Sequence, residues 1–249
     1  MTQFSKVFGP TNSAADTKTT VGAAAALRPG ACIIKELWVG KSNVVNAKEC
    51  AGFITVEAPG LDGPHHYALG NGCGGTTNGG PSIAAEKIDC SIPILPGALV
   101  TISVTDAEVA LGVSVEVGFD KGSGKNVYSY VVGGAGIDPA KDTLLALVDK
   151  MTGVAVKVGK TGRIKEIRYC AGNIVDAKEM QAKVEFVLPV IKGPWEYVFG
   201  SGASGATLGG QAPTDVRDTD IPVKADDTII INITANDALD SATLSFQVV

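Results

Sequence analysis

The sequence predicts an all-β protein built from two tandem jelly-roll-like β-sandwich domains that are related by internal duplication. Apolar residues alternate with polar ones at a period of two, turn residues separate these runs at short intervals, and the second half of the chain repeats the first. The chain has 249 residues, which is long enough for two domains that each bury a core without disulfides or metals.

The alternation is typical of strands with one buried and one polar face. Val100, Ile102 and Val104, for example, alternate with threonine and serine. In the first half of the chain we expect strands near 4–9, 19–27, 33–40, 52–58, 65–70, 87–94, 98–105 and 110–118. In the second half we expect them near 128–133, 151–158, 163–170, 181–188, 195–200, 217–223, 228–234 and 242–249. Eight short strands in about 120 residues favour a sandwich or jelly roll.

The repeat is strongest between 34–80 and 164–210, where a shift of 130 positions aligns 18 identical residues in 47. Its most regular part is G-P-x-x-Y-x-x-G-x-G-x-x-G-x-T-x-G-G, which occurs at 63–80 and again at 193–210. We interpret these positions as a structural repeat loop, a strand followed by a loop of fixed shape. Its residues are Gly63, Pro64, Tyr67, Gly70, Gly72 and Gly75 in the first copy and Gly193, Pro194, Tyr197, Gly200, Gly202 and Gly205 in the second.

Weaker matches extend the repeat to both ends of each half. Residues 4–9 resemble 128–133, and 113–117 are aligned with 244–248. The predicted domains are therefore a first unit at 1–119, a linker rich in Gly, Ser and Lys at 120–127, and a second unit at 128–249.

Helical signals are few and short. Single turns are expected at 47–50 and 177–180, and Pro139 to Lys150 is a longer candidate, with Asp138 as its cap. Both short segments keep Ala-Lys-Glu, so Lys48, Glu49, Lys178 and Glu179 are candidate subunit contacts. The alternative is that each is one capped helical turn that closes a loop.

Composition excludes several classes of function. The net charge is −5 without a run of like charges, whereas a nucleic-acid binder needs a basic surface, so no direct nucleic-acid contact is expected. No apolar segment is long enough to span a membrane, and residues 1–5 do not begin a signal peptide, which predicts a protein that is soluble when unassembled. The five cysteines do not follow the repeat and are expected to be reduced.

A catalytic or metal site is not predicted. The chain has two histidines, His65 and His66, and neighbouring strand residues point to opposite faces, so the pair does not chelate one ion. We expect one to face the surface and one to be partly packed. The Gly-rich segment lacks the Gly-Lys-Ser/Thr of a phosphate loop, and no nucleophile and base motif is present. The prediction is no enzyme, no cofactor and no metal.

The duplicated eight-stranded units and the short linker resemble the double jelly-roll major capsid proteins of icosahedral viruses. The resemblance is architectural and covers the whole chain. It implies a homotrimer whose six jelly rolls form a pseudo-hexagonal capsomer, assembled into a larger lattice in the virion, with copies of itself and other capsid proteins as partners.

Two other classes stay open at this point. One is a cell-surface or carbohydrate-binding tandem sandwich, although Trp38 and Trp195 occupy non-equivalent positions and form no repeated platform. The other is a filament subunit that exchanges the apolar strand at 4–9.

Overall fold

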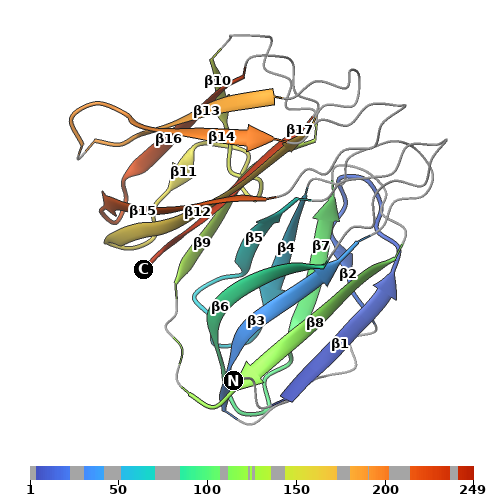
Figure 1. The fold of residues 1–249 in the computed structure, drawn as a ribbon. Helices are drawn as coiled ribbons and strands as arrows, with labels where there is room; N and C mark the ends of the chain where they lie inside the picture. Colours follow the sequence, from blue (N-terminus) through green and yellow to red (C-terminus); the bar gives the residue numbers. More distant parts are fainter. Residues whose placement is uncertain are drawn as a thin grey trace, which may run out of the picture.

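Strands account for almost all of the regular structure of this chain, which is described here from a computed structural model (Figure 1). The described residues are 4–22, 31–41, 52–70, 85–106, 112–122, 124, 127–135, 144–172, 180–189, 191–201, 214–235 and 241–249. They contain strands and turns but no helix, so the all-β prediction is confirmed. Within these ranges there is accordingly no helix of the length and apolarity that crossing a membrane requires.

The first unit is a sandwich of two antiparallel sheets. Its strands are β1 (Phe4–Thr11), β2 (Thr19–Thr20), β3 (Cys32–Gly40), β4 (Gly52–Glu57), β5 (His65–Leu69), β6 (Glu86–Ile94), β7 (Thr101–Asp106) and β8 (Val113–Asp120). One sheet has the order β1-β8-β3-β6 and the other the order β2-β7-β4-β5. This order is that of an eight-stranded jelly roll.

The second unit repeats this arrangement. Its strands are β9 (Tyr128–Ala135), β10 (Leu145–Leu147), β11 (Val156–Lys157), β12 (Gly162–Gly172), β13 (Met180–Val187), β14 (Trp195–Ser201), β15 (Asp215–Val223), β16 (Thr228–Ala235) and β17 (Ser241–Val248). The sheets have the orders β15-β12-β17-β9 and β10-β16-β13-β14, and the short β11 also pairs with β16. No sheet mixes described strands from the two units.

Register and core agree between the units. Ile54 lies opposite Tyr67, and Val184 lies opposite Tyr197, 130 positions later in both strands. β3 has a register irregularity after Ile34, and β12 has the same irregularity at the equivalent place. The inward side chains of each sandwich form a separate buried cluster of Val, Ile, Leu and aromatic residues.

The register also corrects one sequence alignment. Trp38 lies opposite Glu116, and its equivalent Arg168 lies opposite Ser245, so Glu116 corresponds to Ser245. The sequence alignment paired Ser114 with Ser245 instead, two residues away. A slip of two keeps every side chain on the same face, so an alternating pattern does not detect it.

The predicted helix from Pro139 to Lys150 is wrong for residues 144–150, the part of this segment that the structure describes. Leu145 to Leu147 form β10, because Leu145 pairs with Ile233 and Leu147 with Ile231 of β16. Asp138 and the first residues of this segment lie outside the described ranges.

The strand expected near 151–158 is also shorter than predicted. The Asp149 carboxylate accepts hydrogen bonds from the N–H groups of Met151 and Thr152, and Gly153 follows with a φ of 72°, so the chain turns until β11 begins at Val156. β2 is likewise limited to Thr19–Thr20 within the described residues.

Candidate functional site

The most developed site in the described structure is the contact between the two units, centred on β5. This strand lies at the edge of its sheet, and its outer side packs against β9, β12 and β17 of the second unit (Figure 1). An edge strand has a row of unpaired N–H and C=O groups that must find partners when it is buried.

Side chains of the second unit supply those partners. Ser129 Oγ accepts from the His66 N–H at 2.8 Å and donates to the His66 carbonyl at 3.1 Å. Ser245 Oγ accepts from the Ala68 N–H at 2.7 Å, and Thr214 Oγ1 accepts from the Gly70 N–H. Three hydroxyl groups from three parts of the second unit thus complete the edge of a strand in the first.

Two ion pairs cross the same boundary. Arg168 on β12 pairs with Glu86 on β6, and its Nε donates to the Ala68 carbonyl at 3.4 Å. Lys150 Nζ lies 2.7 Å from the carboxylate of Asp16. Arg168 is buried, so its pair with Glu86 contributes to a fixed orientation of the two units only while both charges remain.

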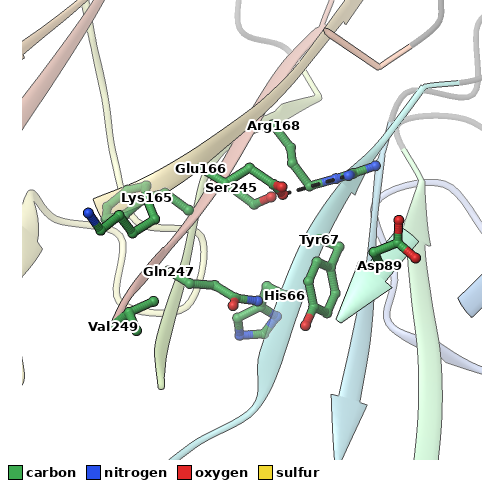
Figure 2. Close-up of a pocket in the computed structure, with 10 residues that line it drawn as sticks. His66, Tyr67, Asp89, Lys165, Glu166, Arg168, Ser245, Gln247 and Val249 are labelled. Atoms are coloured by element: carbon green, nitrogen blue, oxygen red, sulfur yellow. Dashed lines mark ion pairs between the residues drawn. The ribbon is translucent and has the colours of Figure 1, made fainter. Parts of the chain in front are cut away.

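A small cavity of about 160 Å³ lies inside this boundary (Figure 2). Gln247 and Ser245 of β17 line it on one side, and His66 and Tyr67 of β5 line it on the other. Burial raises the pKa of the Tyr67 hydroxyl, and the nearby Gln247 amide opposes that shift. Ligand pockets for small molecules are typically about 300–1,000 Å³, so this cavity is small for such a ligand.

Arg168 lies beside two acidic groups at this boundary, Glu86 and Glu166. Its Nη1 lies 3.8 Å from Glu166, the ion pair drawn in Figure 2. Burial raises the pKa of both Glu86 and Glu166, and the positive charge of Arg168 opposes that shift. Glu86 and Glu166 therefore share the charge of Arg168, whereas Asp89, which also lines the cavity, pairs with Lys87 at 2.8 Å.

The prediction that one histidine faces the surface is wrong, because both are buried. His66 lies under the second unit, with Nδ1 3.0 Å from the Thr55 hydroxyl. His65 points the other way along β5, and neither of its ring nitrogens has a hydrogen-bond partner among the described residues. Burial lowers the pKa of both histidines to about 4. The charges of His65 and Lys18 lower the pKa of His66 further, and the charge of Asp62 opposes the shift at His65. Both rings are neutral at neutral pH.

Two of the buried side chains at this contact have atoms that catalytic sites also use. The His66 and Thr55 pair has the atoms of a base and a hydroxyl; both side chains are buried, and His66 also lines the small cavity. Among the described residues, no group of three or more His, Cys, Asp or Glu side chains is placed to hold a metal ion. The side chains of this site provide hydrogen-bond partners for the backbone N–H and C=O groups at the buried edge of β5.

The predicted repeat-loop residues occupy different surroundings in the two units. Tyr67 belongs to the core cluster of its own unit and also lines the cavity at the contact, whereas Tyr197 is only partly buried on its core. Gly70 belongs to the contact between the units, and Gly200 lies in β14. Gly63 and Pro64 line a second cavity of about 360 Å³ beside Leu61 and Leu99, and Gly193 and Pro194 are exposed. The others, and the candidate subunit contacts, lie outside the described residues: Gly72, Gly75, Gly202, Gly205, Lys48, Glu49, Lys178 and Glu179.

Sequence reasoning missed the four residues that bind β5, namely Ser129, Ser245, Thr214 and Arg168. They occupy polar positions in or beside alternating strands, where solvent exposure is the ordinary expectation. The sequence held one signal for these residues: serine occurs at matching positions, Ser5 and Ser129, in the similar segments that begin the two units.

Neither the protein-family models nor the curated protein sequences contain a match to this chain.

Proposed function

We propose that the protein is a structural, self-assembling shell protein, the major capsid protein of an icosahedral virus, and not an enzyme. Three chains would form a trimeric, pseudo-hexagonal capsomer, and capsomers would tile the shell of the virion. Its partners would be further copies of the chain and other capsid proteins, without direct contact to nucleic acid.

The observation that carries this proposal is the packing of two jelly rolls of equal strand order side by side in one chain. Jelly rolls also occur in lectins and cupins, so the strand order alone does not select a function. What favours a tile is the contact itself. Three hydroxyl groups of the second unit join the outer edge of β5, and two ion pairs elsewhere cross the same boundary, so the two sandwiches are held together as one block.

The polar interior of that contact supports a structural role over a catalytic one. His66, Arg168 and Ser245 are the side chains whose chemistry suits catalysis or binding, and all three are buried in packing the units together. A shell subunit needs rigid, repeated surfaces more than it needs an open cleft.

Negative-stain electron microscopy of the purified protein tests the proposal. We expect discrete tiles with a near-hexagonal outline and, at high concentration, closed shells or curved sheets of such tiles. Filaments would favour assembly by strand exchange, and dispersed single chains at every concentration would remove the shell proposal.

A further inference from the structure

The two units use equivalent surfaces unequally. Val131 on β9 is 1% exposed, although it lies outside the core cluster of its unit, because it faces β5. Its register equivalent on β1 is Val7, which is 58% exposed. The same contrast holds on β12 and its equivalent β3, where Arg168 is 6% exposed and Trp38 is 37% exposed. The face that receives a strand in the second unit is therefore uncovered in the first.

The strand that docks shows the opposite contrast. Ala68 on β5 is fully buried, whereas its equivalent Val198 on β14 is 65% exposed. β14 is the edge strand of its sheet, as β5 is. Since the register is the same, the N–H groups of Glu196 and Val198 point outward as those of His66 and Ala68 do, and no partner for them is found among the described residues.

We propose that the outer edge of β14 docks on the β1-β8-β3 face of a second copy of this chain, repeating the contact that β5 makes within the chain. The donor surface is Glu196 and Val198, and the receiving surface is Ser5, Val7, Trp38 and Glu116. The inference rests on the proposed function in requiring self-association, and it adds which surfaces meet.

The chemistry of the receiving face suits this partner. Ser5 is the equivalent of Ser129, so its hydroxyl serves the N–H and C=O of Glu196. Glu116 is the equivalent of Ser245, and its carboxylate accepts from the Val198 N–H, a charge-assisted bond. The Val198 carbonyl already accepts from Arg217 at 3.2 Å, as the Ala68 carbonyl does from Arg168.

The contact between chains lacks the ion pair that its counterpart within the chain makes. Trp38 stands where the second unit has Arg168, and Asp215, which corresponds to Glu86, pairs with Arg217 of its own unit at 3.2 Å. Trp38 in place of Arg168 and Val198 in place of Ala68 therefore add apolar area where the ion pair is absent, which suits an interface that must form from exposed surfaces. The contact is head-to-tail, so it makes a closed ring if the rotation between units closes, and an open chain otherwise.

Cysteine cross-linking tests the pairing directly. The double variant Val198→Cys, Glu116→Cys places thiols at the positions equivalent to Ala68 and Ser245. Under mild oxidation we expect disulfide-linked dimers and trimers on a denaturing gel, and a ladder that ends at three chains. The pair Val154→Cys, Glu116→Cys is the matched control, because Val154 is also an exposed valine of the second unit. Wild-type protein under the same oxidant gives the background of the five native cysteines.

A complementation experiment separates this contact from a symmetric one. Val7→Glu places a charge on the receiving face, and Val198→Glu places one on the docking strand. Each variant alone should weaken self-association about 10-fold or more, because a charge replaces apolar area that the contact buries. An equimolar mixture retains one intact face and one intact strand, so sedimentation should show a dimer and nothing larger. Leu95→Glu and Val154→Glu, at exposed positions away from both surfaces, should associate like the wild type.

The outcomes distinguish the two proposals. If the wild-type protein assembles, the double cysteine variant forms no disulfide between positions 198 and 116, and Val198→Glu leaves assembly unchanged, this inference is contradicted and the shell proposal stands. Specific cross-linking within filaments supports the inference and contradicts the shell. Protein that remains monomeric throughout contradicts both.

Discussion

The buried histidines on β5 make the stability of the fold depend on pH at the scale of single side chains. Their pKa in the folded protein is about 4, below the ordinary value of 6.5. The unfolded chain therefore binds more protons between these values, so the stabilisation is complete above pH 6.5 and is lost as pH falls toward 4. Each histidine accounts for up to about 3 kcal/mol across that window.

We therefore predict that His66→Gln reduces the pH dependence of stability. Glutamine keeps a polar group toward Thr55 but does not titrate. Urea unfolding at pH 7 and pH 4.5 should show a smaller loss for the variant than for the wild type. Equal losses in both proteins would mean that His66 is not the group protonated on unfolding.

A buried ion pair makes a second prediction at this scale. Lys41 Nζ lies 2.6 Å from Asp106, both side chains are buried, and Ser13 donates to the same carboxylate at 2.9 Å. Lys41→Met leaves a buried carboxylate without its counter-charge, which should lower the free energy of unfolding by about 3–5 kcal/mol. Lys157→Met removes an exposed pair with Asp226 and should cost under about 1 kcal/mol. Chemical denaturation of both variants measures the difference, and similar costs would argue against the role of burial.

At the scale of elements, the edge of β5 depends on single hydroxyl groups. Ser245→Ala removes the acceptor for the Ala68 N–H and leaves that group buried, which should cost about 1–3 kcal/mol. Ser91→Ala, at an exposed position on β6, should stay within about 0.5 kcal/mol of the wild type. Thermal unfolding of the two alanine variants provides the test, and a neutral Ser245→Ala would show that water replaces the hydroxyl.

Equivalent glycines in β1 and β9 have a second element-scale consequence. Gly9 and Gly133 have φ values of 97° and 89°, and a Cβ on Gly133 would lie 2.0 Å from the carbonyl oxygen of Ala242. We predict that Gly133→Ala destabilises the protein by about 1–3 kcal/mol from backbone conformation alone, with the clash in addition. Gly63→Ala is the control, since nothing lies within 4 Å of its added Cβ. Comparable midpoints in denaturant for the two variants would contradict this.

The sequence predicted most strands because a strand that buries only one face has apolar residues at every second position. They failed where tertiary contacts decide. Leu145 to Leu147 form a strand only because Ile231 and Ile233 lie beside them, and the slip between Ser114 and Glu116 preserved the pattern. The contact between the units was beyond prediction for the same reason, because Ser129 and Ser245 look like solvent-facing residues until β5 covers them.

At the scale of the whole molecule, the chain contains one contact between a strand edge and a sheet face. A second copy of each of these two surfaces, one in each unit, is exposed. β5 fills the face of β9, β12 and β17, while β14 and the face of β1, β3 and β8 remain without a partner strand in the described structure. In the assembly that we propose, head-to-tail repetition of this contact would join chains into a ring of alternating units where the rotation closes, and such rings would pack into the proposed shell.

The mass of the assembled protein tests this claim most directly. Size-exclusion chromatography with multi-angle light scattering, run over a range of loading concentrations, should give a species of three chains that persists on dilution, together with larger assemblies at high load. A single chain at the highest concentration would contradict the claim.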